Sequence, residues 1–173
     1  RGGHARRLDG VLVAKVDLTS IPGPPAKSPF PRDSVAVAYT DGASRGNPGP
    51  AAYGCVYTLD DGTTLCAEGS TIGKDTNNVA EWRGCVAALE RLAAWGVTEA
   101  VLRLDSELVV KQLRGEYKVK KEHLRPLFDR AMELSGRIER VRIEHVPRAQ
   151  NAVADAVANA ALDGKTPAAG PSH

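Results

Sequence analysis

Cysteine is scarce in this sequence, and so are aromatic residues, which make up 5% of the 173 positions. The three cysteines, Cys55, Cys66 and Cys85, are odd in number and form no Cys-x-x-Cys motif. That pattern argues against a disulfide framework and against a zinc site. It favours a protein of the reducing cytoplasm.

Long apolar runs are also missing. No stretch approaches the ~18 residues of a membrane-spanning helix, and the early apolar run Val11-Leu12-Val13-Ala14 is short and is followed by Lys15. We therefore expect neither a membrane segment nor a signal peptide. A large excess of one charge is absent as well, because the net charge is only +2. Any nucleic-acid binding must come from a local patch rather than from the overall field.

The composition divides the chain into three parts. Residues 1–33 are basic and carry five prolines in the stretch from Ile21 to Pro31, which predicts a flexible extension that ends in a stiff linker. A basic arm that contacts nucleic acid is the alternative for this part. Residues 34–162 are long enough for one domain with its own core. Residues 163–173 are rich in Gly, Pro and Ser, which predicts a disordered tail.

Patterns of apolar residues predict the elements of the central domain. Strands are expected where apolar residues alternate, and helices where they recur every three or four positions. The predicted order is βββαβααβα, with the approximate ranges 34–41, 52–59, 63–71, 76–95, 100–104, 106–113, 122–135, 138–146 and 151–162. A meander of three strands followed by strand–helix alternation predicts an α/β fold, a five-stranded mixed sheet flanked by helices.

The segment from Tyr39 to Pro50 is the most informative part of the chain. The first predicted strand ends on Asp41, and the loop behind it contains three glycines, two prolines and one asparagine, which is turn chemistry. Asp105 follows another predicted strand in the same manner. Ligands of open α/β sheets bind at the carboxyl ends of parallel strands. We therefore expect Asp41 and Asp105 to lie at one site.

Two further acids complete a candidate cluster. Glu81 lies near the start of the helix 76–95, and Asp155 lies between two alanines near the start of the last helix. If the four carboxylates converge, each raises the pKa of the others, and cations are needed to balance the charge. Mg²⁺ and Mn²⁺ prefer oxygen ligands, and two such ions can catalyse phosphodiester cleavage. Each acid also has an ordinary explanation when it is considered alone. Glu81 would interact with the helix dipole, Asp105 would cap a helix, and Asp155 would be a solvated residue on a helix surface.

Taken together, these features resemble type 1 ribonuclease H. The resemblance spans residues 34–162 and rests on the motifs Thr40-Asp41-Gly42, Gly46-Asn47-Pro48-Gly49, Thr76-Asn77-Asn78 with Ala80-Glu81, Leu104-Asp105-Ser106, and Asn151 to Asp155. It implies the ribonuclease H fold, whose element order agrees with the order above. It also implies an endonuclease that cuts the RNA strand of RNA–DNA hybrids with two Mg²⁺ ions, for which Mn²⁺ can substitute. The implied catalytic metal ligands are Asp41, Glu81, Asp105 and Asp155.

The resemblance also suggests which residues contact the substrate. An enzyme selective for RNA must sense 2′-hydroxyls across a shallow minor groove, a task for neutral donors and acceptors. Thr76 and Asn78 look like part of the family's grip on a phosphate of the DNA strand, although the run is also a plain helix N-cap. The predicted substrate-binding residues are Ser44, Arg45, Gly46, Asn47, Thr76, Asn77, Asn78, Lys118 and Lys120.

The chain departs from the family pattern in three places. The basic, tryptophan-rich insertion of longer members is missing, and only residues 116–121 fill the gap. This segment is expected to grip phosphates through its lysines, or else to be a solvated connection. Glu107 stands where many members have glutamine. The mobile histidine before the last aspartate is also missing, so we count Arg148, which can pair with a phosphate, among the catalytic residues. His145 is expected to be structural, within the last strand.

Two other functions stay open on the sequence. A resolvase or transposase would share the fold and the acids, but these enzymes do not resemble the Asn-Pro-Gly loop or the Thr-Asn-Asn run. A non-catalytic module that only binds hybrids would not need all four acids. The expected partner is an RNA–DNA hybrid, with no protein partner indicated, and a monomer is expected.

Overall fold

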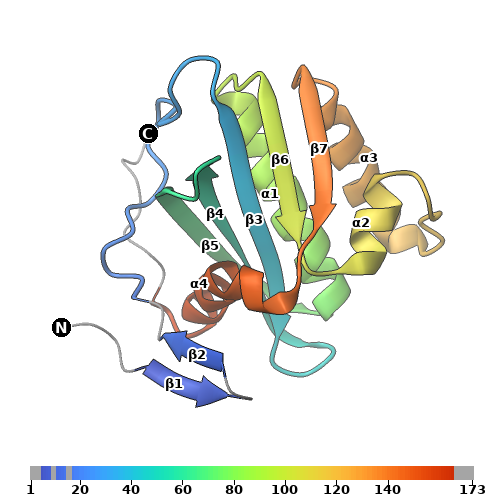
Figure 1. Cartoon of the computed structure of the whole chain (residues 1–173). Coiled ribbons are helices and arrows are strands. Elements are labelled where there is room, and N and C mark those ends of the chain that lie inside the picture. The colour runs from blue at the N-terminus through green and yellow to red at the C-terminus, as the bar shows by residue number, and fades with distance from the viewer. Residues whose placement is uncertain (1–4, 9–10, 15–16, 166–173) are drawn as a thin grey trace.

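A five-stranded sheet forms the centre of the structure, a computed structural model that describes residues 5–8, 11–14 and 17–165 (Figure 1). The strand order is β5-β4-β3-β6-β7. The bounds are Val35–Ser44 for β3, Gly49–Leu59 for β4, Thr64–Asp75 for β5, Glu99–Leu104 for β6 and Arg140–His145 for β7. Strands β3, β4 and β5 are antiparallel, whereas β6 and β7 run parallel to β3. The predicted five-stranded mixed sheet is confirmed.

Helices cover both faces of the sheet. They are α1 (Asn77–Ala94), α2 (Glu107–Leu113), α3 (Arg125–Ser135) and α4 (Ala152–Leu162). Helix α1 packs on β3 and β4 from one side, with α3 against it, while α4 crosses β3, β4 and β5 on the other side (Figure 1). Short 3₁₀ turns, Glu122–Leu124 and Arg148–Asn151, precede α3 and α4. The predicted order of strands and helices in the central domain is confirmed.

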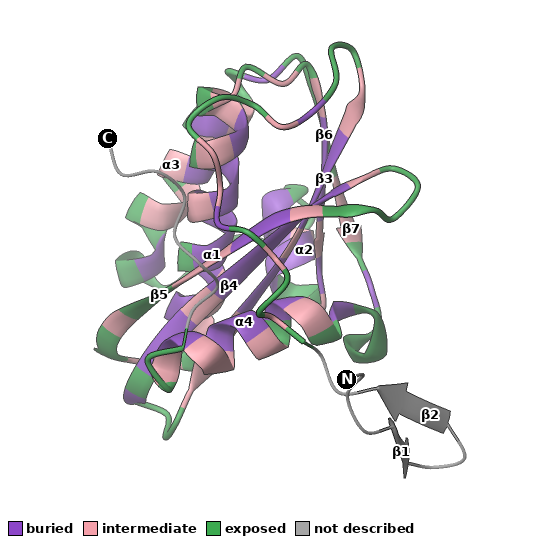
Figure 2. Ribbon diagram, turned by 90° about the vertical axis from the view of Figure 1, so that its left-hand side faces the viewer, coloured by how far each residue is buried: buried purple, intermediate pink, exposed green. Residues whose placement is uncertain are grey.

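The main core lies between the sheet and α1. Trp82, Leu89 and Leu92 of α1 are fully buried against Leu102 and Leu104 of β6, among other residues. Their spacing is the three-and-four repeat of an amphipathic helix, so one face of α1 is buried along its length. Burying each such side chain stabilises the fold by about 1.5–3 kcal/mol. In Figure 2 the buried residues run along the strands and the inner faces of the helices.

Small residues let α4 lie close to the other face of the sheet. A Cβ atom on Gly54 of β4 would come within 2.4 Å of the carbonyl oxygen of Ala154, which no side chain can tolerate. Ala154, Val157 and Ala158 of α4 are fully buried there. The alanine-rich composition of the last helix is therefore a requirement of close backbone packing. This packing fixes the height of α4 over the central strands.

Several element boundaries differ from the predicted ranges. Strand β3 runs past Asp41 to Ser44 because its antiparallel pairing with β4 continues to the pair Ser44–Ala51. Strand β5 likewise extends to Asp75. The predicted helix 122–135 is divided into a 3₁₀ turn, Glu122–Leu124, and α3, which has Pro126 in its first turn. Local patterns locate these elements, whereas pairing partners decide where they end.

Residues 17–33 of the N-terminal extension pack against the domain, and we call them the N-terminal strap. The carbonyl oxygen of Pro22 accepts a hydrogen bond of 3.0 Å from the Ala67 N–H of the edge strand β5. The carbonyl oxygen of Pro25 accepts one of 3.0 Å from the Trp95 indole. Phe30 is buried edge-to-face against the same indole. This differs from the flexible extension that the sequence suggested, because proline carbonyls and a few apolar side chains find partners on the domain.

A short pair of strands precedes the N-terminal strap. Residues Val11–Ala14 form strand β2 and pair antiparallel with β1 (Ala5–Leu8). Residues 15–16 and most of the predicted tail, 166–173, lie outside the described residues. Within the described ranges, no helix is both long and apolar enough to cross a membrane.

Candidate active site

Two of the predicted acids lie at matching positions of neighbouring parallel strands. The parallel pairing of β3 with β6 runs as far as Tyr39 and Arg103. Asp41 and Asp105 each follow two residues later, so both stand at the carboxyl end of this pairing. The prediction that the strand ends at Asp41 is wrong for the whole strand, since β3 continues beside β4. The prediction holds for the parallel pairing of β3 with β6, which stops just before Asp41 and Asp105. The site lies at the edge of the sheet where this pairing stops.

Gly42 brings the third acid to the other two. Its N–H donates a 3.1 Å hydrogen bond to Oε1 of Glu81, in the second turn of α1. A Cβ atom at position 42 would lie 2.3 Å from the Glu81 backbone nitrogen. Only glycine therefore lets the start of α1 approach β3 this closely. Asp41 thus contributes one acid to the site, and Gly42 leaves the space that Glu81 of α1 needs to reach it.

The carboxylates of Asp41, Glu81 and Asp105 form what we call the acidic cluster. One oxygen from each lies within 4.8 Å of the others. Asp41 is 5% exposed, and burial, followed by the charge of Glu81, raises its pKa to about 10. Burial also raises the pKa of Glu81 to about 7. Like charges held this close disfavour full ionisation in the absence of a counter-ion.

The fourth predicted acid lies beside the cluster rather than inside it. Asp155 is an exposed residue of the first turn of α4. Its carboxyl is the last of several causes, after burial and the other acids, that raise the pKa of Asp41. The Asn159 side-chain amide donates to the backbone and carboxylate oxygens of Asp155, at 3.0 and 3.3 Å. The structure therefore brings three acids together and leaves the fourth at the rim.

Asn151 ties α4 to the site, which the sequence pattern alone did not reveal. Its side-chain amide is buried and donates a 2.8 Å hydrogen bond to the carbonyl oxygen of Thr40, the residue before Asp41. This contact joins positions 111 residues apart. An asparagine shortly before the last helix was visible as part of a motif, but its partner was not.

The acidic cluster suits a hard divalent cation. Glu81 Oε2 is buried and has no hydrogen-bond partner among the described residues. An unpaired buried carboxylate oxygen costs free energy that a cation would recover. All the donors are carboxylate oxygens, which Mg²⁺ and Mn²⁺ prefer over softer ligands. The residues present therefore fit such an ion, with Asp41, Glu81 and Asp105 as its holders.

The glycine loop, residues 45–48, is tied to the start of α1. Asn47 Oδ1 accepts a 3.1 Å hydrogen bond from the Asn77 N–H, and the Ser44 hydroxyl donates to the carbonyl oxygens of Gly46 and Asp75. Thr76 is the N-cap of α1, as predicted, and its hydroxyl accepts from the Val79 N–H. These contacts place the predicted residues of the loop and the cap side by side.

The Arg45 side chain forms an ion pair with a residue outside the glycine loop. Its guanidinium lies 2.8 Å from the carboxylate of Asp163, at the end of α4. Both side chains are 48% exposed. The pairing was not predicted, because the two residues are far apart in sequence and no local pattern links them.

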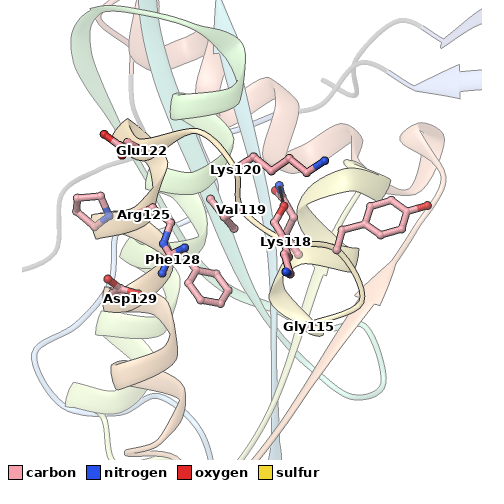
Figure 3. A pocket seen from close by; sticks show the side chains of 11 residues that line it. Gly115, Lys118, Val119, Lys120, Glu122, Arg125, Phe128 and Asp129 are labelled. Atoms are coloured by element: carbon pink, nitrogen blue, oxygen red, sulfur yellow. Dashed lines mark hydrogen bonds between the residues drawn. The ribbon is translucent and has the colours of Figure 1, made fainter.

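Residues 116–121, the connection between α2 and the turn before α3, separate two hollows. A hollow of about 530 Å³ lies toward α1 and is lined by Asn78, Leu108, Lys118, Lys120 and others. A second, of about 960 Å³, lies toward α3. Figure 3 shows the second one, with Arg125 and Phe128 on the α3 side and Lys118 on the side of the connection. Lys118 and Lys120 line both hollows, so the connection is a basic ridge near Asn78.

The two remaining predicted positions are exposed. Arg148 lies in the 3₁₀ turn before α4. Burial raises the pKa of Glu81, and the positive charge of Arg148 opposes that rise. Arg148 therefore lies close enough to the acidic cluster to affect it. His145 ends β7 and is exposed, rather than packed with the core as a structural histidine would be.

Comparison with known proteins decides the family. A family model described as reverse transcriptase-like matches residues 39–161. Ribonuclease HI of Halobacterium salinarum is 51% identical over 170 residues, which cover 92% of this chain and 83% of that protein. The chain belongs to the type 1 ribonuclease H family. The crystal structure of the H. salinarum ribonuclease H1 agrees with this one at a TM-score of 0.72, covering 75% of this chain and 98% of that one.

Other members of the ribonuclease H family are similar over the same region. The bifunctional protein Rv2228c of Mycobacterium tuberculosis is 48% identical over 128 residues, which are 73% of this chain. The chain spans only 35% of that protein's length. The structure of LC11-RNase H1 in complex with an RNA/DNA hybrid is 40% identical, with a TM-score of 0.71 and coverage of 75% of this chain and 97% of that one. The predicted ribonuclease H fold is thereby confirmed.

Proposed function

We propose that this protein is an endonuclease that hydrolyses the RNA strand of RNA–DNA hybrids with the help of two Mg²⁺ ions. The observation that carries the proposal is the acidic cluster, three carboxylates within 4.8 Å at the carboxyl end of parallel strands. The unpaired buried oxygen of Glu81 supports a cation as the missing partner. A relative of the same fold has been crystallised with an RNA/DNA hybrid. We further propose a monomer of the cytoplasm.

In this mechanism the chain's own residues have distinct tasks. When bound, the ions would activate water and stabilise the charge that develops on the phosphate. Asp41, Glu81 and Asp105 would hold them, and Asp155 would complete the ligand set from the rim. Arg148 pairs with the phosphate of the RNA strand, since a guanidinium is a donor and not a base at neutral pH.

The substrate would lie across the glycine loop, the start of α1 and the connection. Ser44, Gly46 and Asn47, with Asn77, offer neutral groups for the 2′-hydroxyls of the RNA strand. Thr76 and Asn78 offer donors for a phosphate of the DNA strand, at a helix N-terminus that favours anions. Lys118 and Lys120 extend the same surface as phosphate contacts.

The test compares labelled substrates with and without Mg²⁺. We expect cleavage of the RNA strand of a hybrid, no cleavage without a divalent ion, and little cleavage of duplex DNA. The variants Asp41→Asn, Glu81→Gln and Asp105→Asn should lose measurable cleavage while circular dichroism shows them folded. Asp129→Asn, which changes an exposed acid of α3, serves as the matched control. Preferred cleavage of DNA junctions, or metal-independent binding without cleavage, would favour the other two functions.

A further inference from the structure

The ion pair between Arg45 and Asp163 has no part in the site described so far. It joins the glycine loop to the residue that caps the C-terminus of α4. The Arg45 Nη1 and Asp163 Oδ1 atoms are 2.8 Å apart, and both side chains are about half exposed. A guanidinium beside the carbonyl end of a helix is also favoured by the helix dipole. In the free protein the guanidinium is thus occupied by an acid of the same chain.

The loop backbone does not depend on this ion pair. The Arg45 N–H donates a 2.8 Å hydrogen bond to the Pro50 carbonyl oxygen. A Cβ atom on Gly49 would lie 2.2 Å from the Arg45 carbonyl oxygen, so the two ends of the loop are in contact. Asn47 is held by Asn77. The Cα of Arg45 is therefore fixed, while its long side chain can move between partners.

The partner of Arg45 lies on the same helix as Asp155, the acid beside the cluster. Asp163 follows Asp155 by eight residues on α4, which corresponds to ~12 Å along the helix axis. A nucleic-acid strand covers that distance in a few nucleotide steps, since it rises ~3.4 Å per nucleotide. A phosphate at that point meets an arginine whose donors are directed at a carboxylate. A phosphate that binds the Nη1 side of the guanidinium, which now faces Asp163, must displace that carboxylate.

We infer that Asp163 sets the affinity for the substrate by competing with a backbone phosphate for the guanidinium of Arg45. This inference deepens the proposed function and rests on it. An exposed carboxylate holds an arginine weakly, whereas a phosphate accepts two parallel hydrogen bonds from it. A phosphate of the hybrid therefore replaces Asp163 as the partner of Arg45. The affinity for the hybrid is lower than it would be without Asp163, because the ion pair must first be broken. Asp163 contacts no reacting atom and acts only through Arg45.

Removing the competitor should strengthen hybrid binding. For Asp163→Asn we expect the Kd for a hybrid without Mg²⁺, and the KM with Mg²⁺, to fall two- to fivefold, with kcat unchanged. Asp163→Glu keeps the charge and should stay near wild type. Arg45→Ala should weaken binding and reduce the salt dependence of the Kd by about one phosphate contact.

The double variant separates this inference from simple repulsion between an acid and a polyanion. In the Arg45→Ala background, Asp163→Asn should leave the Kd unchanged, because the acid no longer has a guanidinium to hold. Asp61→Asn, an exposed acid in the turn between β4 and β5, controls for loss of one negative charge and should change nothing.

Three results would overturn the inference. They are an equal gain from Asp163→Asn in both backgrounds, a loss of affinity on Asp163→Asn, and no change at all. Wild-type cleavage of the hybrid with Mg²⁺ is measured in the same series. Its absence would refute the proposed function, whereas cleavage together with any of the three results would refute only the role of Asp163.

Discussion

The acidic cluster should destabilise the metal-free protein, and Asp41→Asn should relieve that cost. Folding raises the pKa of Asp41 from about 3.8 to about 10, through burial and then the charge of Glu81. The folded state therefore keeps a proton that the unfolded chain releases above about pH 4. Stability is lost as the pH rises from about 4 toward about 10, and the loss is absent below pH 4. Asparagine has the same shape and cannot ionise.

The size of the effect follows from the same pKa values. One pKa unit corresponds to 1.36 kcal/mol, and about three units separate the ordinary value of 3.8 from pH 7. The ionisation of Asp41 can therefore destabilise the folded protein at pH 7 by at most about 4 kcal/mol. Water at the open edge of the site reduces it, so we expect Asp41→Asn to gain about 1–3 kcal/mol at pH 7 in EDTA. For a chain of this length that is a rise in Tm of roughly 3–10 °C.

The assay is urea or thermal unfolding at pH 4 and pH 7, with EDTA or with millimolar Mg²⁺. Mg²⁺ binds only the folded cluster, so it should stabilise the wild type and narrow its gap to Asp41→Asn. Asp129→Asn, the exposed control, should match the wild type throughout. An Asp41→Asn variant that is less stable than wild type at pH 7 in EDTA would refute the reasoning. So would a gap of equal size at pH 4.

Three further predictions concern the rim of the site and the strap. Arg148→Ala should slow hybrid cleavage by about tenfold, or ~1.4 kcal/mol, and an unchanged rate and affinity would make Arg148 an ordinary loop residue. Lys118→Ala with Lys120→Ala should lower hybrid affinity and flatten its dependence on KCl by up to two phosphate contacts; an unchanged slope would leave the connection a solvated segment. Phe30→Ala should cost about 3 kcal/mol in urea unfolding, because the ring is buried against Trp95 and its loss leaves a cavity; a cost below about 0.5 kcal/mol would mean that the strap is not held there.

Local chemistry predicted the parts of the site that depend on neighbours in sequence. Asp41 at the end of a strand pairing and Thr76 as a helix cap follow from short patterns, and the structure shows both. The convergence of Glu81 on Asp41 came from the family resemblance, since no local pattern reports a contact across 39 residues, such as that between Gly42 and Glu81.

What the sequence did not predict depends on contacts between distant segments. The partner of Arg45, the anchor between Asn151 and Thr40, and the position of Asp155 at the rim are each set by where α4 lies on the sheet. That position follows from close packing against Gly54. Proline-rich composition likewise suggested a free linker, because composition does not show that carbonyl groups and a phenyl ring have partners elsewhere.

The N-terminal strap has a consequence for where this domain can be cut. The family match begins at residue 39, so a fragment trimmed to that match would omit the strap. Such a fragment would free the Ala67 N–H on the outer strand of the sheet and uncover the Trp95 indole. An unprotected outer strand pairs readily with other chains, and an exposed aromatic surface adds to that tendency. The shortest fragment that resists aggregation should therefore begin near residue 17, ahead of the region that matches the family model.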